Sequence, residues 1–235
     1  MKPSAVIFAL AAALTAACGG STAPAINRNN PGAGTHTVKV VGDVSADDVP
    51  GTPNYNTSFD VVLTNNLGNP VSGAIVTISN PSAGNITLTE SGPGSGDYIA
   101  SRTAFYDGDF SLTVIRTPDT VSGVVVGGMA RFAITKPLRF DTVLVNQPLL
   151  VLWTVPSQAK TAEIETRAFP TTTLPDTGAF RIPGTAFANP RPDDRVRVFR
   201  NNQVDIAGGL AGSILTLSVR SSADPICVKS TTSTC

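Results

Sequence analysis

The sequence contains a single histidine, His36, and this scarcity removes most histidine-based chemistry. A Ser-His-Asp triad or a histidine-rich zinc site needs an imidazole beside a nucleophile or beside further ligands. His36 stands at the start of an apolar alternation, and no spacing pairs it with a nucleophile or an acid. We therefore expect a solvated His36 and no enzyme activity.

Charged residues are also scarce. Lys and Arg together number 17, Asp and Glu together number 17, and the four types make up 14% of the chain. Non-specific binding of nucleic acid needs a strong positive excess, so no nucleic-acid partner is expected. A solvated, disordered chain carries more charge and fewer apolar residues than this one, so most of the chain is expected to fold.

Long apolar runs are lacking except near the start, where residues 5–14 are all small or apolar. This run is shorter than the roughly 20 residues that span a bilayer, but it fits the hydrophobic region of a secretory signal. Residues 14–21 read LTAACGGS, with small residues before Cys18 and Gly or Ser after it. This pattern resembles a bacterial lipoprotein signal, and the alternative is an ordinary secretory signal that contains a cysteine.

The lipoprotein resemblance implies that residues 1–17 are removed and that Cys18 carries a diacylglycerol and an acyl chain such as palmitate. Two or three acyl chains anchor a protein firmly to a membrane. Gly19 after the cysteine implies sorting to the outer membrane of the bacterial cell envelope, on its periplasmic or cell-surface face. The membrane is therefore an expected partner through the lipid.

The three cysteines support this assignment, because an odd number is unusual in an exported protein. With Cys18 lipidated, Cys227 and Cys235 form an even pair that can close a short disulfide loop in an oxidising compartment. Two cysteines without a further Cys or His nearby make a poor metal site, so no metal or other cofactor is expected.

Residues 18–34 predict a flexible tether behind the lipid. They read CGGSTAPAINRNNPGAG, which is rich in Gly, Asn, Pro and Ala and shows no hydrophobic period.

Residues 35–135 predict a β-sandwich, because apolar and polar residues alternate in short runs separated by turn residues. Gly127-Gly128 interrupts the last run and predicts a bulge. The expected strands are 36–41, 58–64, 74–79, 85–89, 97–101, 110–115 and 121–135. Residues 63–79 pass through a Gly-Asn-Pro-Val turn into an Ile-Val-Thr-Ile strand, and this segment resembles the bacterial Ig-like repeats of the invasin/intimin type.

Residues 136–235 predict a second sandwich with expected strands 140–145, 149–155, 161–167, 179–182, 195–200 and 213–220. Residues 150–157 read LVLWTVPS and resemble the early tryptophan strand of fibronectin type III-like domains, which implies a buried Trp153. The expected fold class is therefore all-β, with two tandem Ig-like β-sandwich domains after the signal peptide and tether.

Asp43, Asp47 and Asp48 are the candidates for a metal site. Their oxygens suit Ca²⁺, but their spacing lacks the Gly and the terminal Glu of an EF-hand loop. A solvated acidic turn is the default expectation.

Arg195, Arg197 and Arg200 are the candidates for contact with a partner. Arg195 and Arg197 share one strand face with Phe199, where they could meet an anionic glycan or a protein. The alternative is an exposed strand that charge protects against edge pairing.

The leading hypothesis is a non-enzymatic, membrane-anchored lipoprotein that presents Ig-like domains to a protein or glycan, in adhesion or envelope organisation. The second is an accessory extracytoplasmic subunit docked on a membrane protein complex. The third is a carbohydrate-active enzyme that uses loop carboxylates such as Asp43, Asp47 and Asp48.

Overall fold

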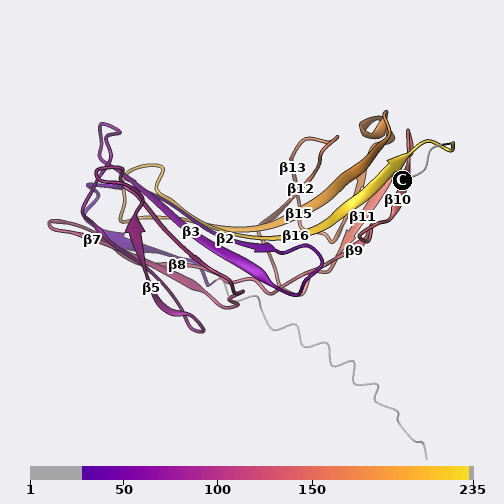
Figure 1. Cartoon of the computed structure of the whole chain (residues 1–235). Coiled ribbons are helices and arrows are strands. Elements are labelled where there is room, and N and C mark those ends of the chain that lie inside the picture. Colours follow the sequence, from indigo (N-terminus) through magenta and orange to yellow (C-terminus); the bar gives the residue numbers. More distant parts are fainter. Residues whose placement is uncertain (1–27, 233–235) are drawn as a thin grey trace, which may run out of the picture.

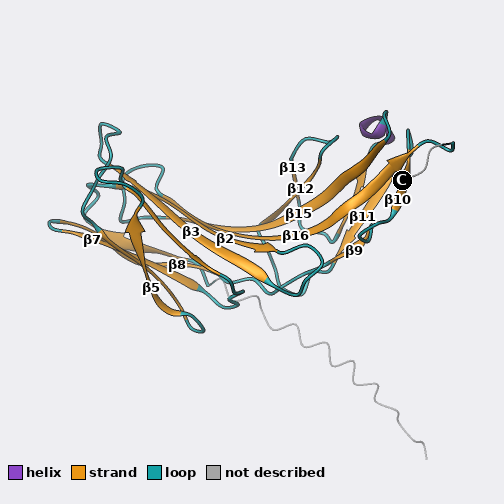
Figure 2. Cartoon of the chain, in the orientation of Figure 1, coloured by secondary structure: helices purple, strands orange, loops and turns teal. Residues whose placement is uncertain are grey.

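The computed structural model describes residues 28–232, and within them the chain is almost entirely β-strand (Figures 1 and 2). These residues contain one short 3-10 helix, η1 (Gly184–Phe187), and no α-helix. The first strands are β1 (Asn30–Gly34), β2 (Lys39–Asp48), β3 (Tyr55–Thr64), β4 (Ile75–Asn80), β5 (Gly84–Glu90), β6 (Asp97–Arg102), β7 (Phe110–Arg116) and β8 (Asp119–Val126). The later strands are β9 (Ile134–Lys136), β10 (Thr142–Leu144), β11 (Leu149–Trp153), β12 (Thr161–Thr166), β13 (Thr172–Leu174), β14 (Ala179–Ile182), β15 (Arg191–Asp205) and β16 (Ile214–Lys229). The predicted all-β class, with strands layered as in a sandwich, is confirmed.

The first half is a sandwich whose two layers are joined at one edge. One layer has the strand order β1-β8-β7-β4-β5, and the other has the order β6-β3-β2-β16-β15. The layers are joined because β5 pairs with both β4 and β6. The period-2 pattern fixes which side chains enter the core. In β3, for example, Phe59, Val61 and Leu63 are buried while the residues between them are exposed.

The second half packs a three-stranded sheet, in the order β14-β11-β9, beside the ends of β12, β15 and β16. Trp153 at the end of β11 is buried, as the sequence predicted. Val151 on the same face of β11 joins it in the core.

The long strands β15 and β16 connect the two halves. β16 pairs in parallel with β2 of the first half over Ile214–Arg220, and its other end pairs with β10. β15 pairs with β16 along nearly its whole length (Figure 1). Main-chain hydrogen bonds therefore cross between the halves, which fixes how they are oriented. The predicted division at residues 135 and 136 stays a prediction.

Three expectations about the first half need correction. Residues 30–34, assigned to the tether, form β1, whose main chain pairs with β8. The first long strand begins at Lys39 rather than at His36, which has a left-handed φ of 57°. Gly127-Gly128 is no bulge, because β8 ends at Val126. Gly128 instead passes close to Gly108, and a Cβ added to Gly128 would lie 2.0 Å from the carbonyl oxygen of Gly108.

The signal peptide, the lipidated Cys18 and the predicted disulfide partner Cys235 lie outside the described residues. These assignments stay predictions. Within residues 28–232, no helix is both long enough and apolar enough to cross a membrane.

Candidate functional site

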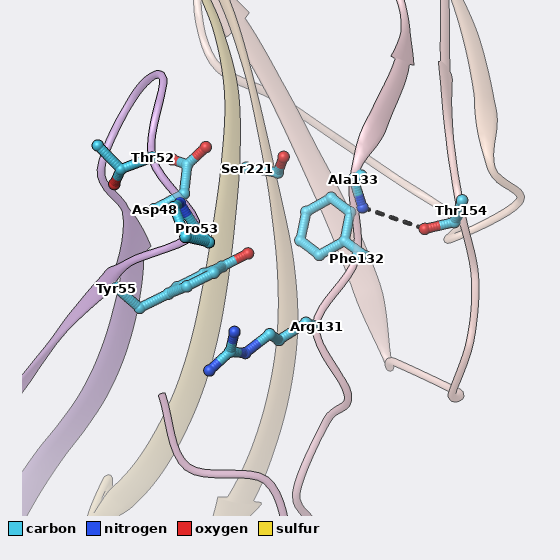
Figure 3. A pocket seen from close by; sticks show the side chains of 9 residues that line it. All are labelled: Asp48, Thr52, Pro53, Tyr55, Arg131, Phe132, Ala133, Thr154 and Ser221. Atoms are coloured by element: carbon cyan, nitrogen blue, oxygen red, sulfur yellow. Dashed lines mark hydrogen bonds between the residues drawn. The ribbon is translucent and has the colours of Figure 1, made fainter. Parts of the chain in front are cut away.

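A pocket of about 410 Å³ lies where the two halves meet (Figure 3). It collects residues from the end of β2, the β2–β3 loop, the start of β3, the β8–β9 connection, the position directly after β11 and the middle of β16. The lining residues are Asp48, Thr52, Pro53, Tyr55, Arg131, Phe132, Ala133, Thr154 and Ser221.

Hydrogen bonds hold the walls of this junction pocket in place. The amide of Ala133 donates to Thr154 Oγ1 at 3.1 Å, and the amide of Ile134 donates to Ser221 Oγ at 3.3 Å. Across the pocket, the amide of Val49 donates to the carbonyl of Asn54 at 3.0 Å and closes the β2–β3 loop. These bonds fix the positions of the pocket walls.

Tyr55 and Arg131 form the aromatic and cationic side of the pocket. The guanidinium carbon of Arg131 lies 5.2 Å from the ring centroid of Tyr55 and 4.9 Å from that of Phe105, which are cation–π distances. Tyr55 and Phe105 meet edge to face at 5.0 Å. Neither the Tyr55 hydroxyl nor the Arg131 guanidinium has a hydrogen-bond partner among residues 28–232, so both remain available as donors.

Asp48 is the carboxylate of the pocket. Ser222 holds it, because its amide donates to Oδ2 at 2.8 Å and its hydroxyl to Oδ1 at 2.9 Å. Burial raises the pKa of Asp48, while the bonds from Ser222 and the charge of Arg220 oppose that rise. Burial also raises the pKa of Tyr55; the Asp48 charge adds to that rise and Arg131 opposes it. The Tyr55 hydroxyl therefore stays a neutral donor at physiological pH.

Phe132 forms an apolar part of the lining and is supported by a buried cation. The guanidinium carbon of Arg200 lies 5.4 Å from the ring centroid of Phe132. Arg200 is itself fixed by Asp176 and by the carbonyl of Ser157. The Phe132 ring is thus held by the interior of the second half rather than by solvent-exposed contacts.

Chemically, the junction pocket offers donors, one carboxylate and apolar surface. Its lining contains no histidine and no cysteine, and Asp48 is its only carboxylate. His36, at the other end of β2 from Asp48, places its Nδ1 3.2 Å from the carbonyl of Gly209. The arrangement can donate hydrogen bonds to a ligand from Tyr55 and Arg131 and accept them at Asp48.

The three aspartates named as metal candidates do not converge. They lie on strand β2 rather than in a turn, with Asp43 and Asp47 on the outer face and Asp48 on the opposite face. Asp47 pairs with Arg220 at 3.2 Å. Within residues 28–232, no group of three or more Asp, Glu, His or Cys is arranged to hold a metal ion, so the three aspartates do not form one cluster.

The three arginine candidates for partner contact likewise do not lie on one surface. Arg195 and Arg197 both pair with Glu165, at 3.6 and 3.2 Å, and remain partly exposed. Arg200 is completely buried, which corrects its assignment to a partner surface. The reason is strand parity, because Arg200 lies on the same face as Val196 and Val198 and opposite to Arg195 and Arg197.

Sequence reasoning missed Tyr55, Arg131 and Phe132. The segment Pro50-Gly51-Thr52-Pro53 indicates a turn, so the sequence could have predicted the loop between Asp48 and Tyr55. Nothing in the sequence indicates that residues 131–133 lie against that loop.

The chain matches no protein-family model and no curated protein. Among solved structures, it is similar to fibronectin(III)-like modules of Clostridium thermocellum CbhA, at 15% identity over 82% of this chain and 94% of that one, with a TM-score of 0.28. It is also similar to the Yersinia pseudotuberculosis adhesin InvE, at 13% identity over 83% of this chain and 60% of that one, with a TM-score of 0.27. The chain thus spans less than two thirds of that adhesin chain. At these values the likeness supports no transfer of ligand or partner.

Proposed function

We propose that this protein is a non-enzymatic binding protein of the bacterial cell envelope, held to the membrane by lipid on Cys18. Its Ig-like body presents the junction pocket to a protein or glycan partner, in adhesion or in envelope organisation. The observation that carries the proposal is the junction pocket itself. It combines available donors on Tyr55 and Arg131 with the carboxylate of Asp48 on a fixed frame of strands.

The pocket is tested by comparing two arginine variants of the full chain. Detergent-solubilised envelopes are passed over immobilised wild-type protein, Arg131→Glu and Arg102→Glu. Arg102 is the matched control, because it is exposed and its Nη1 donates only to the neighbouring carbonyl of Ser101. We expect one partner to be retained by the wild type and the control and lost with Arg131→Glu. Equal retention by all three proteins contradicts the proposal, as does chemical conversion of the retained partner by the pure protein.

The anchor is tested by fractionating cells that express the Cys18→Ser protein. We expect this substitution to move the protein from the membrane to the soluble extracytoplasmic fraction, because the acyl chains then have no attachment point. Cys235→Ser is the matched control and should stay with the membrane. Membrane association that survives Cys18→Ser contradicts the lipid anchor.

A further inference from the structure

The junction pocket presents opposite charges that do not neutralise each other. Asp48 and Arg131 lie on the two sides of Tyr55 (Figure 3), and the cation that acts on Asp48 is Arg220 rather than Arg131. Both charges act on Tyr55, since Asp48 raises its pKa and Arg131 lowers it. Ser222 already donates to both oxygens of Asp48, but a carboxylate has further acceptor sites, and the Arg131 guanidinium donates no hydrogen bond within residues 28–232. Both groups can therefore still bond to a ligand.

The Tyr55 hydroxyl is the second feature that indicates a ligand. Tyr55 is only 8% exposed, and its hydroxyl end points among the lining residues (Figure 3). Among residues 28–232, the Tyr55 oxygen is not one of the buried side-chain atoms that lack a partner, so the hydroxyl reaches the open part of the pocket. It can therefore bond to a molecule in the pocket.

We infer that the junction pocket binds a ring of a neutral saccharide, an inference that rests on the proposed binding function. An anionic ligand is opposed by Asp48, and a cationic ligand is opposed by Arg131. A sugar hydroxyl avoids both conflicts, because it donates to Asp48 and accepts from Arg131 or from the Tyr55 hydroxyl. A polyhydroxylated, uncharged molecule thus bonds to both groups without the repulsion that an ion of either sign meets from one of them.

The size and apolar surface of the pocket agree with this ligand class. A volume of about 410 Å³ falls within the range of about 300–1,000 Å³ typical of small-molecule sites. Pro53 is exposed and supplies apolar surface for the C–H groups of a sugar ring, and the accessible edge of Phe132, which is 5% exposed, adds to it. Arg200 fixes Phe132 from inside the protein, so this surface does not need to be ordered on binding.

The test is calorimetric titration of the full chain in detergent with six-unit oligosaccharides. The neutral probes are cellohexaose, xylohexaose, mannohexaose and laminarihexaose, and the charged probes are hexagalacturonate and a chitosan hexamer. The pocket variants are Tyr55→Phe, which removes only the unpartnered hydroxyl, and Arg131→Gln. Their matched controls are Tyr106→Phe and Arg102→Gln, which lie outside the lining residues.

We expect a neutral probe to bind, with an affinity about tenfold weaker for each pocket variant and unchanged for each control. Fluorescence of Trp153, the single tryptophan, should show that every variant is folded. The inference is overturned if no neutral probe binds at about 1 mM, if only a charged probe binds, or if the pocket variants bind as the wild type does.

Two outcomes separate this inference from the proposed function. If the envelope partner is retained in an Arg131-dependent manner but no neutral probe binds, the binding function stands and the saccharide inference fails. If no partner depends on Arg131 and no probe binds, both fail.

Discussion

Arg200 and Asp176 form an ion pair in the interior of the second half, with Arg200 Nη2 2.5 Å from Asp176 Oδ2. The Arg200 side chain is fully buried and that of Asp176 is 3% exposed. The second oxygen of Asp176 accepts a hydrogen bond from Trp153 Nε1 at 2.9 Å. One carboxylate in the β13–β14 connection therefore joins β11 to β15, and through Arg200 it supports Phe132 in the junction pocket.

The first prediction concerns this ion pair. Asp176→Asn removes the charge and leaves Arg200 buried without a counter-ion, so we expect the free energy of unfolding to fall by about 3–5 kcal/mol. Urea unfolding followed by Trp153 fluorescence measures the change. The control is Asp193→Asn, because Asp193 meets Arg167 at 3.6 Å in an exposed pair worth about 0–1 kcal/mol. Similar losses in the two variants would contradict a special role for the buried pair.

The second prediction concerns the docking of β1, which the sequence assigned to the tether. A Cβ added to Gly208 would lie 2.1 Å from the carbonyl carbon of Ala33. Gly208→Ala should therefore displace β1 from β8, and hydrogen exchange should show faster exchange of the β1 amides. Gly92→Ala is the control, since an added Cβ there has nothing within 4 Å. Unchanged exchange in Gly208→Ala would mean that β1 is not held at this point.

The third prediction concerns pH and the paired carboxylates Asp43 and Asp60, which face each other across β2 and β3. Burial, and then the charges of Asp60 and Asp47, raise the pKa of Asp43 from 3.8 to about 6. The folded state thus binds more protons than the unfolded chain between these values. Stability falls as pH rises from about 4 to about 6, and the full penalty is present above about 6.

Asp43→Asn should remove that penalty. We expect the free energy of unfolding to rise by up to about 3 kcal/mol near pH 7.5 and by less than about 1 kcal/mol near pH 4. Urea unfolding at the two pH values provides the measurement, with the exposed Asp205→Asn as the control. An equal gain at both pH values would rule out titration of Asp43 as its source.

The fourth prediction concerns Cys227, which is buried on β16 where this strand pairs with β10. If Cys227 and Cys235 are linked as the sequence predicts, peptide mapping without reductant should recover the two cysteines in one fragment. Cys235→Ser should then lower the free energy of unfolding by about 2–3 kcal/mol, the value expected for closure of a short loop. Recovery of Cys235 as a free thiol in protein from the envelope would contradict the link.

Local periodicity predicted individual strands well where one face of the strand is apolar and the other polar. Strands β3, β4, β7 and β12 all fall within two or three residues of their predicted bounds. Local periodicity did not predict strands that form only because they pair with residues far away in the sequence. Residues 221–229 contain Pro225 and several small polar residues, and they extend β16 because β10 and β15 pair with them.

The candidate site was harder to predict for the same reason. Asp48 was noted for its charge, and its role in the junction pocket depends on Ser222, 174 residues away in the chain. The sequence around Arg131 does not indicate its place in the pocket, because that place depends on its contacts with Tyr55 and Phe105.

The sequence by itself determined that the described chain is all-β and which side chains of its regular strands are buried, because alternation with period 2 is a local property. It also predicts a lipoprotein signal at Cys18 and a disulfide between Cys227 and Cys235, and both stay predictions. The tertiary structure alone decided that β16 pairs with β2, that Arg200 is internal, and that a pocket forms between the halves. Those features depend on contacts between residues far apart in the chain, which no local pattern records.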